Sequence, residues 1–136
     1  MTNMDWVRKW LKRAKEDLLA AHRVMEGYHP KLLEVCCYQC QQAGEKALKA
    51  FLTLQERTFP FTHDLRTLCQ ICAEYDERFD NFADDCSILS PYAIRARYPA
   101  DDDMEEAEAQ AALRKAERIV AFCASLIPPV PPADAE

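Results

Sequence analysis

The chain has 136 residues and a mass of 15.6 kDa, and 49% of its residues are hydrophobic, which is enough for one sizeable core in a single domain. The formal net charge is −6, and its excess lies in residues 101–136, which carry 3 basic and 9 acidic side chains, whereas residues 1–100 carry 14 of each. These numbers argue against a globally basic nucleic-acid-binding protein, but they leave room for a local basic strip.

Composition favours helices. Only two glycines occur, and valine, isoleucine and threonine are sparse beside alanine, leucine, glutamate and lysine, so we expect an all-α fold. The seven cysteines are an odd number, and no apolar leader precedes them, which favours a reducing, cytoplasmic location. Because no run of 18 apolar residues occurs, we expect no membrane-spanning helix.

The first predicted helix covers about residues 3–28. Its apolar residues alternate in steps of four and three, which is the pattern of a bundle seam. The seam consists of Val7, Leu11, Ala14, Leu18, Ala21, Met25 and Tyr28. Trp6 and Trp10 flank it and lie either in a widened buried face or on a partner's surface.

The same helix carries a basic strip, for which a solvated face is the simpler interpretation. The strip consists of Arg8, Lys9, Lys12, Arg13 and Lys15.

The second predicted helix begins at His29-Pro30, because proline fits the first turn of a helix. It runs to about Leu54 with the same four-three rhythm, so it should pair antiparallel with the first. Gly44 is small enough to let another helix approach closely. The seam consists of Leu33, Cys37, Cys40, Gly44, Ala47, Phe51 and Leu54.

Two shorter helices are predicted next. Thr62 can cap a helix that carries Leu65, Leu68, Cys69 and Cys72 on one side. A further helix is predicted from about Phe79 to Tyr98-Pro99, where it ends, and it must be kinked or split at Pro91, which removes a backbone donor. Its apolar residues are Phe79, Phe82, Cys86, Leu89 and Ala93.

The last helix is predicted to run to about Leu126, capped by the acidic run at 101–103. Its stripe consists of Ala109, Leu113, Ala116, Val120, Cys123 and Ile127. The four prolines of the tail suggest an extended, largely disordered end. We therefore expect a helical bundle over 1–127 and a proline-rich disordered tail over 128–136.

Metal and cofactor sites are not predicted. The cysteines fall on the apolar seams, where cysteine behaves as a small hydrophobic residue, so core packing is favoured over zinc binding. The acidic cluster at 101–108 could hold Mg²⁺, but helix capping explains it more simply. No glycine-rich phosphate loop is present.

Two arginine–histidine pairs have the same spacing, Arg23 with His29 and Arg57 with His63. In acid–base cleavage of RNA, a histidine can move the 2′-hydroxyl proton while an arginine stabilises the developing charge. Each pair, however, straddles a loop or a helix end, so no regular element holds it rigidly.

Five segments in order resemble bacterial and archaeal proteins of the HEPN family (higher eukaryotes and prokaryotes nucleotide-binding). Three of these segments are QQAGEKALKA (41–50), THDLRTL (62–68) and YAIRARYP (92–99). The opening DWVRKWLKRAKEDLLAA and the closing EAQAALRKAERIVAF extend the resemblance over nearly the whole chain except the tail. The resemblance implies an up-and-down bundle of four main helices plus a short extra one, commonly a homodimer.

The resemblance also implies two kinds of function. Many such proteins pair with a minimal nucleotidyltransferase in a toxin–antitoxin-like system, and others are metal-independent ribonucleases with an arginine–four-to-six–histidine motif. Arg97 occupies the position of that arginine, but residues 101–104 contain no histidine, which puts cleavage in doubt. The weak catalytic candidates are Arg97 and His63.

The resemblance further implies a polar surface that binds a nucleotide phosphate or RNA backbone, with tyrosine stacking on a base. Its residues are Gln42, Glu45, Lys46, Lys49, Arg95, Arg97 and Tyr98. The simpler alternative is that Glu45 and Lys49 form an ion pair within the helix and that Arg97 fixes the turn before Pro99.

Three functions follow from the sequence. The first is a non-catalytic nucleotide- or RNA-binding subunit that docks a minimal nucleotidyltransferase. The second is a metal-independent endoribonuclease, and the third is a homodimeric interaction module that binds no small ligand. The first is preferred, because Lys46 suits a phosphate contact and the histidine of the nuclease motif is missing.

Overall fold

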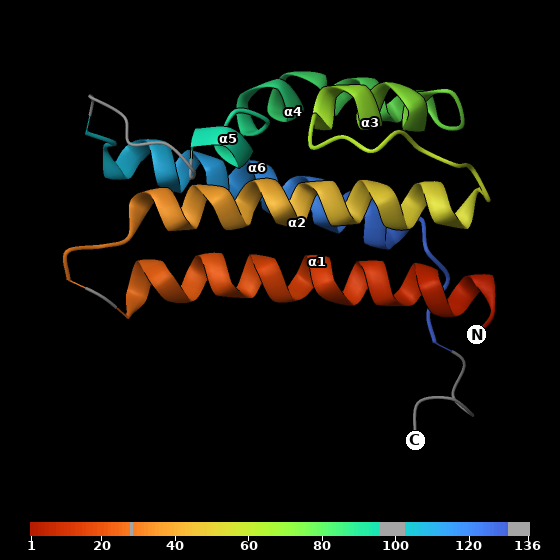
Figure 1. The fold of residues 1–136 in the computed structure, drawn as a ribbon, viewed down its shortest axis with the longest axis horizontal. Helices are drawn as coiled ribbons and strands as arrows, with labels where there is room; N and C mark the ends of the chain where they lie inside the picture. The colour runs from red at the N-terminus through yellow and green to blue at the C-terminus, as the bar shows by residue number, and fades with distance from the viewer. Residues whose placement is uncertain (28, 96–102, 131–136) are drawn as a thin grey trace.

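The computed structural model describes residues 1–27, 29–95 and 103–130, and every regular element in these ranges is helical. The chain passes up and down the bundle (Figure 1), with two long antiparallel helices, a third pass of short helices, and a last long helix. The long helices are α1 (Asn3–Glu26), α2 (Leu33–Leu54) and α6 (Glu106–Ser125). The short helices are α3 (Leu65–Ala73), η1 (Glu77–Phe82), α4 (Ala83–Leu89) and α5 (Tyr92–Arg95). The predicted all-α, up-and-down bundle is confirmed.

Helix α1 begins with a reciprocal cap. The Thr2 hydroxyl accepts from the Asp5 amide at 3.2 Å, and the Asp5 carboxylate accepts from the Thr2 amide at 2.8 Å, so two amide donors of the first turn are satisfied. The helix ends at Glu26, two residues before the predicted end, and Tyr28 lies outside the described residues.

Helix α2 is the centre of the bundle. It contacts α1, α3, α4, α5 and α6, and 13 of its 22 residues are buried. A single four-three seam was predicted for it, and that prediction is too narrow, because neighbouring helices cover α2 on several sides. Polar residues outside the predicted seam are therefore buried as well.

Three helix starts differ from the predictions. Helix α2 begins at Leu33 rather than Pro30, since the turn from α1 takes up residues 29–32 and Leu33 is the first of the segment to pack on the core. Asp64, not Thr62, caps α3, because its carboxylate accepts from the Arg66 amide at 3.0 Å. Helix α6 begins at Glu106 after an N-cap, Glu105, that makes no side-chain bond. Of the acidic run at 101–103 that was predicted to cap this helix, residues 101 and 102 lie outside the described residues.

The third pass is broken where Pro91 predicted a break. Helix α4 ends at Leu89 and α5 begins at Tyr92, so the split is confirmed. The preceding segment, Glu77–Phe82, is a 3-10 helix rather than part of one α-helix.

The cysteines pack in the core. All seven are free and buried, as the position of most of them on the apolar seams predicted. Burial raises the pKa of the Cys37 thiol to about 12, which keeps this sulfur protonated at neutral pH.

In the described ranges, no helix is both long and apolar enough to cross a bilayer.

Gly44 lies where α2 meets α3, as its small size suggested. A Cβ at this position would lie 3.1 Å from Leu65 Cδ1, with Ile119 and Leu89 also within contact distance. We expect Gly44→Val to lower the free energy of unfolding by about 1–3 kcal/mol, because the added methyl groups overpack the core. Urea unfolding measures the change, with Ala107→Val on the exposed face of α6 as the control for helix propensity. Equal losses in both variants would contradict the close approach.

Candidate functional site

A buried polar cluster joins the centre of α2 to the loop before α3. Glu45 lies at its centre: Oε1 is 2.9 Å from His63 Nδ1 and accepts from Gln41 Nε2 at 3.1 Å, and Oε2 accepts from Lys49 Nζ at 3.0 Å. Gln41 also donates to the backbone carbonyl of His63 at 2.9 Å. The cluster therefore ties the loop to the helix through both the side chain and the backbone of His63.

The ion pair of Glu45 and Lys49 is buried. Their residues are only 4% and 8% exposed, and the Lys49 ammonium lies 5.5 Å from the ring centres of both Trp10 and Phe59. Burial works to raise the pKa of Glu45, but hydrogen bonds from His63, Lys49 and Gln41 outweigh it and leave that pKa below its ordinary value. The carboxylate is therefore charged and fully engaged inside the protein.

Glu45 and Lys49 were predicted to lie on a polar surface, but both residues are buried. The helical ion pair, which was the simpler alternative, is what the structure shows. These two residues were misplaced because they lie outside the apolar seam, and the seam alone does not reveal how many helices surround α2.

Gln42 and Lys46 remain partly exposed on the neighbouring face of α2. Gln42 Nε2 donates to Gln41 Oε1 at 2.7 Å, and so belongs to the edge of the buried cluster. Lys46 Nζ donates to Asp17 of α1 at 2.5 Å, with side chains 22% and 19% exposed. Of the two predicted cations on α2, Lys46 is the one that remains partly exposed beside α1.

Arg95 lies in a different part of the molecule. Its guanidinium is 3.4 Å from Glu34 and donates to Glu108 at 3.1 Å, and Tyr92 donates to the same carboxylate at 2.5 Å. Burial, together with this bond to Glu108, raises the pKa of Tyr92 above its ordinary value. Arg95 thus holds the start of α2 to the start of α6.

Arg95 and Lys46 do not share a site. Glu34, the partner of Arg95, precedes Lys46 by twelve residues along α2, which is about 18 Å of helix. Arg97 and Tyr98 lie outside the described residues, and so does the part of the predicted polar surface that they were expected to form.

The arginine–histidine pairs are not held together as catalytic pairs. Arg57 lies 3.2 Å from the Tyr75 hydroxyl and 3.3 Å from Glu74, whereas His63 bonds Glu45. Arg23 lies 3.8 Å from Glu26 instead. Among the described residues, no group of three or more histidine, cysteine, aspartate or glutamate side chains could hold a metal ion.

A hollow of about 480 Å³ lies between the N-terminal half of α1 and α2. Four cations and two indoles line it: Trp6, Lys9, Trp10, Lys12, Arg13 and Lys46. Trp6 is 51% exposed and has the Lys9 ammonium 5.5 Å from its ring centre, whereas Trp10 packs edge-on against Phe59 with ring centres 6.4 Å apart. The two tryptophans therefore differ: Trp6 offers an open ring and Trp10 is partly covered.

The sequence contains every residue of this hollow, but no local pattern shows that they form one site. The basic strip was interpreted as a solvated face, and Lys46 was assigned to a surface with Arg97. The available signal was the interleaving of Trp6 and Trp10 with Lys9, Lys12 and Arg13 within two helical turns.

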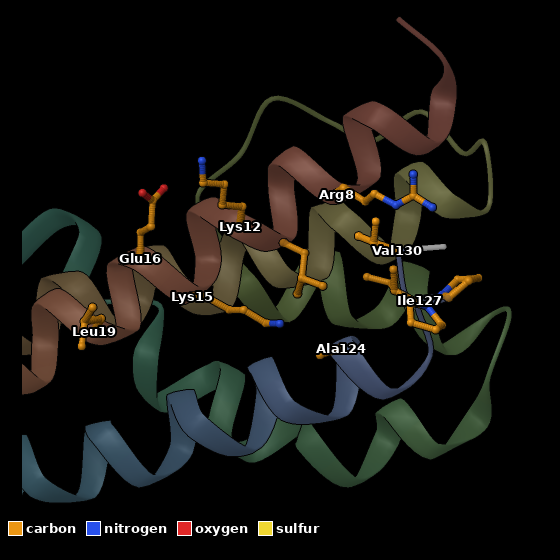
Figure 2. Close-up of a pocket in the computed structure, with 11 residues that line it drawn as sticks. Arg8, Lys12, Lys15, Glu16, Leu19, Ala124, Ile127 and Val130 are labelled. Atoms are coloured by element: carbon orange, nitrogen blue, oxygen red, sulfur yellow. The ribbon is translucent and has the colours of Figure 1, made fainter. Parts of the chain in front are cut away.

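A second hollow, of about 630 Å³, lies on the other flank of α1, beside the end of α6. Figure 2 shows its lining from both helices and from the segment that follows α6. The two hollows share Lys12, so the cationic face of α1 borders both.

Comparison with known proteins gives one family match and two similar folds. The family model of the HEPN domain matches residues 7–126. The crystal structure of TT1696 from Thermus thermophilus has a TM-score of 0.76 and 25% identity, and the alignment covers 88% of this chain and 96% of that one. ST0689, an archaeal HEPN homologue, has a TM-score of 0.70 and 22% identity, with coverages of 90% and 98%. No curated protein matches the chain.

Proposed function

We propose, since the chain belongs to the HEPN domain family, that it is a cytoplasmic subunit that binds single-stranded RNA or a nucleotide without cleaving it. Its partner in this proposal is a minimal nucleotidyltransferase, in a toxin–antitoxin-like pair, and the subunit itself is a homodimer.

The observation that carries the proposal is the hollow between α1 and α2. Its cations suit phosphate oxygens, and the open Trp6 ring suits stacking on a base, which is the combination that single-stranded nucleic acid requires. Lys46 lines this hollow from α2. We therefore keep Lys46 as a proposed phosphate contact, but in a site formed with α1 rather than with Arg97. Arg95, Arg97 and Tyr98 remain proposed contacts of a longer ligand.

An endoribonuclease is the alternative, and one contact favours it. His63 is half-exposed, and its Nδ1 lies 2.9 Å from the buried Glu45 carboxylate, an arrangement that orients an imidazole for proton transfer. Against it stands the absence of histidine from residues 101–104, where the resemblance to the ribonuclease members would require one. The third possibility, a homodimeric interaction module, predicts binding to neither RNA nor nucleotide.

One titration separates the three functions. EDTA-treated protein is mixed with a labelled single-stranded RNA oligonucleotide and, separately, with ATP, and both binding and RNA length are followed. We expect saturable binding and intact RNA. Shortened RNA would favour the endoribonuclease, and a folded protein that binds neither ligand would overturn the proposed function. Sedimentation of the same sample tests the homodimer, which a monomer throughout the micromolar range would contradict.

A further inference from the structure

The groove between α1 and the end of α6 combines an apolar floor with a cationic edge (Figure 2). Leu11 and Leu19 of α1, Ala124 of α6, and Ile127 and Val130 of the segment that follows α6 contribute to the apolar lining. Leu19 and Val130 are 54% and 46% exposed, so this surface leaves apolar side chains in contact with water.

Three cations border the same groove. Arg8, Lys12 and Lys15 follow one another at steps of four and three residues, so they share one face of α1 with Leu11 and Leu19. In Figure 2, the Lys15 side chain reaches into the space between the two helices. The lining contains a single acidic residue, Glu16, so the edge of the groove is positively charged.

The cations lack partners within the described ranges. Arg8, Lys12 and Lys15 form no ion pair there, and Arg8 Nε is buried without a hydrogen-bond acceptor. By contrast, Lys31, Lys46, Arg78 and Arg118 all have a carboxylate within bonding distance. Although the chain has a net charge of −6, this edge is positively charged and is therefore suited to an acidic partner.

A second copy of the chain is a poor occupant. A two-fold interface brings the same patch of both copies together, so the three cations of one copy would face the three cations of the other. Such an arrangement is repulsive unless anions separate them. The charge pattern thus favours a chemically different protein.

We propose that this groove docks an acidic amphipathic helix from another protein. The partner's apolar residues, at helical spacing, would lie on Leu11, Leu19 and Ile127, and its carboxylates would pair with Arg8, Lys12 and Lys15. The distance from Arg8 to Leu19 along α1 is about 16 Å, or three helical turns, which fits a helix laid in a groove. This inference does not depend on RNA binding at the other flank of α1.

Fluorescence anisotropy with a synthetic peptide tests the proposal. The probe is a helical peptide of about four turns with leucines along one stripe and glutamates on both sides of it. Two control peptides are used: one has lysine in place of each glutamate, and the other has the same acidic composition with prolines in its centre. We expect saturable binding of the acidic helix to the full chain and none of either control.

Variants locate the binding. Leu19→Glu and Lys15→Glu should each weaken the acidic peptide by about tenfold or more, because each places a negative charge beside the peptide's carboxylates. Both residues are exposed, so folding should be retained, which circular dichroism checks. Matched controls are Ile88→Glu on α4, which is 49% exposed, and Arg114→Glu, an exposed cation of α6, and neither should alter the affinity.

Four outcomes would overturn the proposal: no binding of the acidic peptide, equal binding of the proline-containing control, equal affinity for Leu19→Glu and wild type, or a dimer that Leu19→Glu converts to a monomer. The last outcome would assign the groove to a second copy. Vesicles with anionic lipids are tested in parallel, and if the chain binds them through Leu19 but does not bind the peptide, a membrane surface is the occupant. Since Trp6 lies outside this groove, loss of RNA binding in Trp6→Ala with retained peptide binding separates this proposal from the proposed function.

Discussion

Replacing Glu45 by alanine is expected to lower the free energy of unfolding by about 3–5 kcal/mol. The substitution leaves the Lys49 ammonium buried between Trp10 and Phe59 without its carboxylate, and an uncompensated buried charge costs about this much. It also releases His63, and with it one tie between α2 and the loop before α3. The measurement is urea unfolding followed by circular dichroism at neutral pH.

The controls separate burial from charge. Glu26→Ala removes the carboxylate of an exposed pair with Arg23, whose side chains are 68% and 73% exposed, and should cost less than about 1 kcal/mol. The double variant Glu45→Gln with Lys49→Met should lose less than Glu45→Ala alone, because no unpaired charge remains in the core. If Glu45→Ala and Glu26→Ala cost the same, the buried pair does not stabilise the protein as described.

The contribution of Glu45 should depend on pH in one direction. Its pKa in the folded protein lies below its ordinary value, so folding favours the ionised carboxylate. The stabilisation is therefore complete above the ordinary glutamate pKa, and it is lost as the pH falls through the lowered value. Unfolding curves of wild type and Glu45→Gln should accordingly converge at acidic pH. A difference that is constant from neutral to strongly acidic pH would contradict this assignment.

The largest functional effect is expected for Trp6→Ala, which should weaken binding of a single-stranded RNA oligonucleotide by about 5- to 150-fold. Stacking of one base on an aromatic ring contributes about 1–3 kcal/mol, and Trp6 is the open indole of the hollow. Because the side chain is 51% exposed, its removal should leave the unfolding midpoint nearly unchanged. Fluorescence anisotropy with labelled RNA measures the affinity.

Matched variants test the geometry of the hollow. Trp6→Phe should retain part of the affinity, and Phe61→Ala, which removes a fully exposed aromatic ring elsewhere, should have no effect. Lys9→Ala and Arg13→Ala should each reduce the steepness with which affinity falls as salt rises, by about 0.7 in the logarithmic slope for each phosphate that the variant leaves unbound. Equal affinity of wild type and Trp6→Ala would remove α1 from the RNA-binding surface.

Sequence patterns predicted the elements that local forces control. The helical spacing of Val7, Ala14 and Ala21 predicted α1, and Pro91 predicted the break between α4 and α5. Both predictions succeeded because helical periodicity and the missing proline amide act within a few residues of the chain. The caps were less well predicted. Thr62 and Asp64 both have suitable side chains, and only the path of the loop selects Asp64.

The candidate site depended more on tertiary structure. Lys46 and Asp17 are 29 residues apart in the sequence, and His63 and Glu45 are 18 residues apart. Neither contact follows from a local sequence pattern. Glu45 and Lys49 appeared to be surface residues because the apolar seam passes beside them, but the helices around α2 enclose them.

The sequence by itself therefore determined an all-helical chain with its seams, its break at Pro91 and its run of cations on α1. The tertiary structure alone decided which of the polar residues are buried and which line a hollow. The physical reason is that helix formation and amphipathicity depend on neighbours within about four residues, whereas burial and ion pairing depend on which helices pack together.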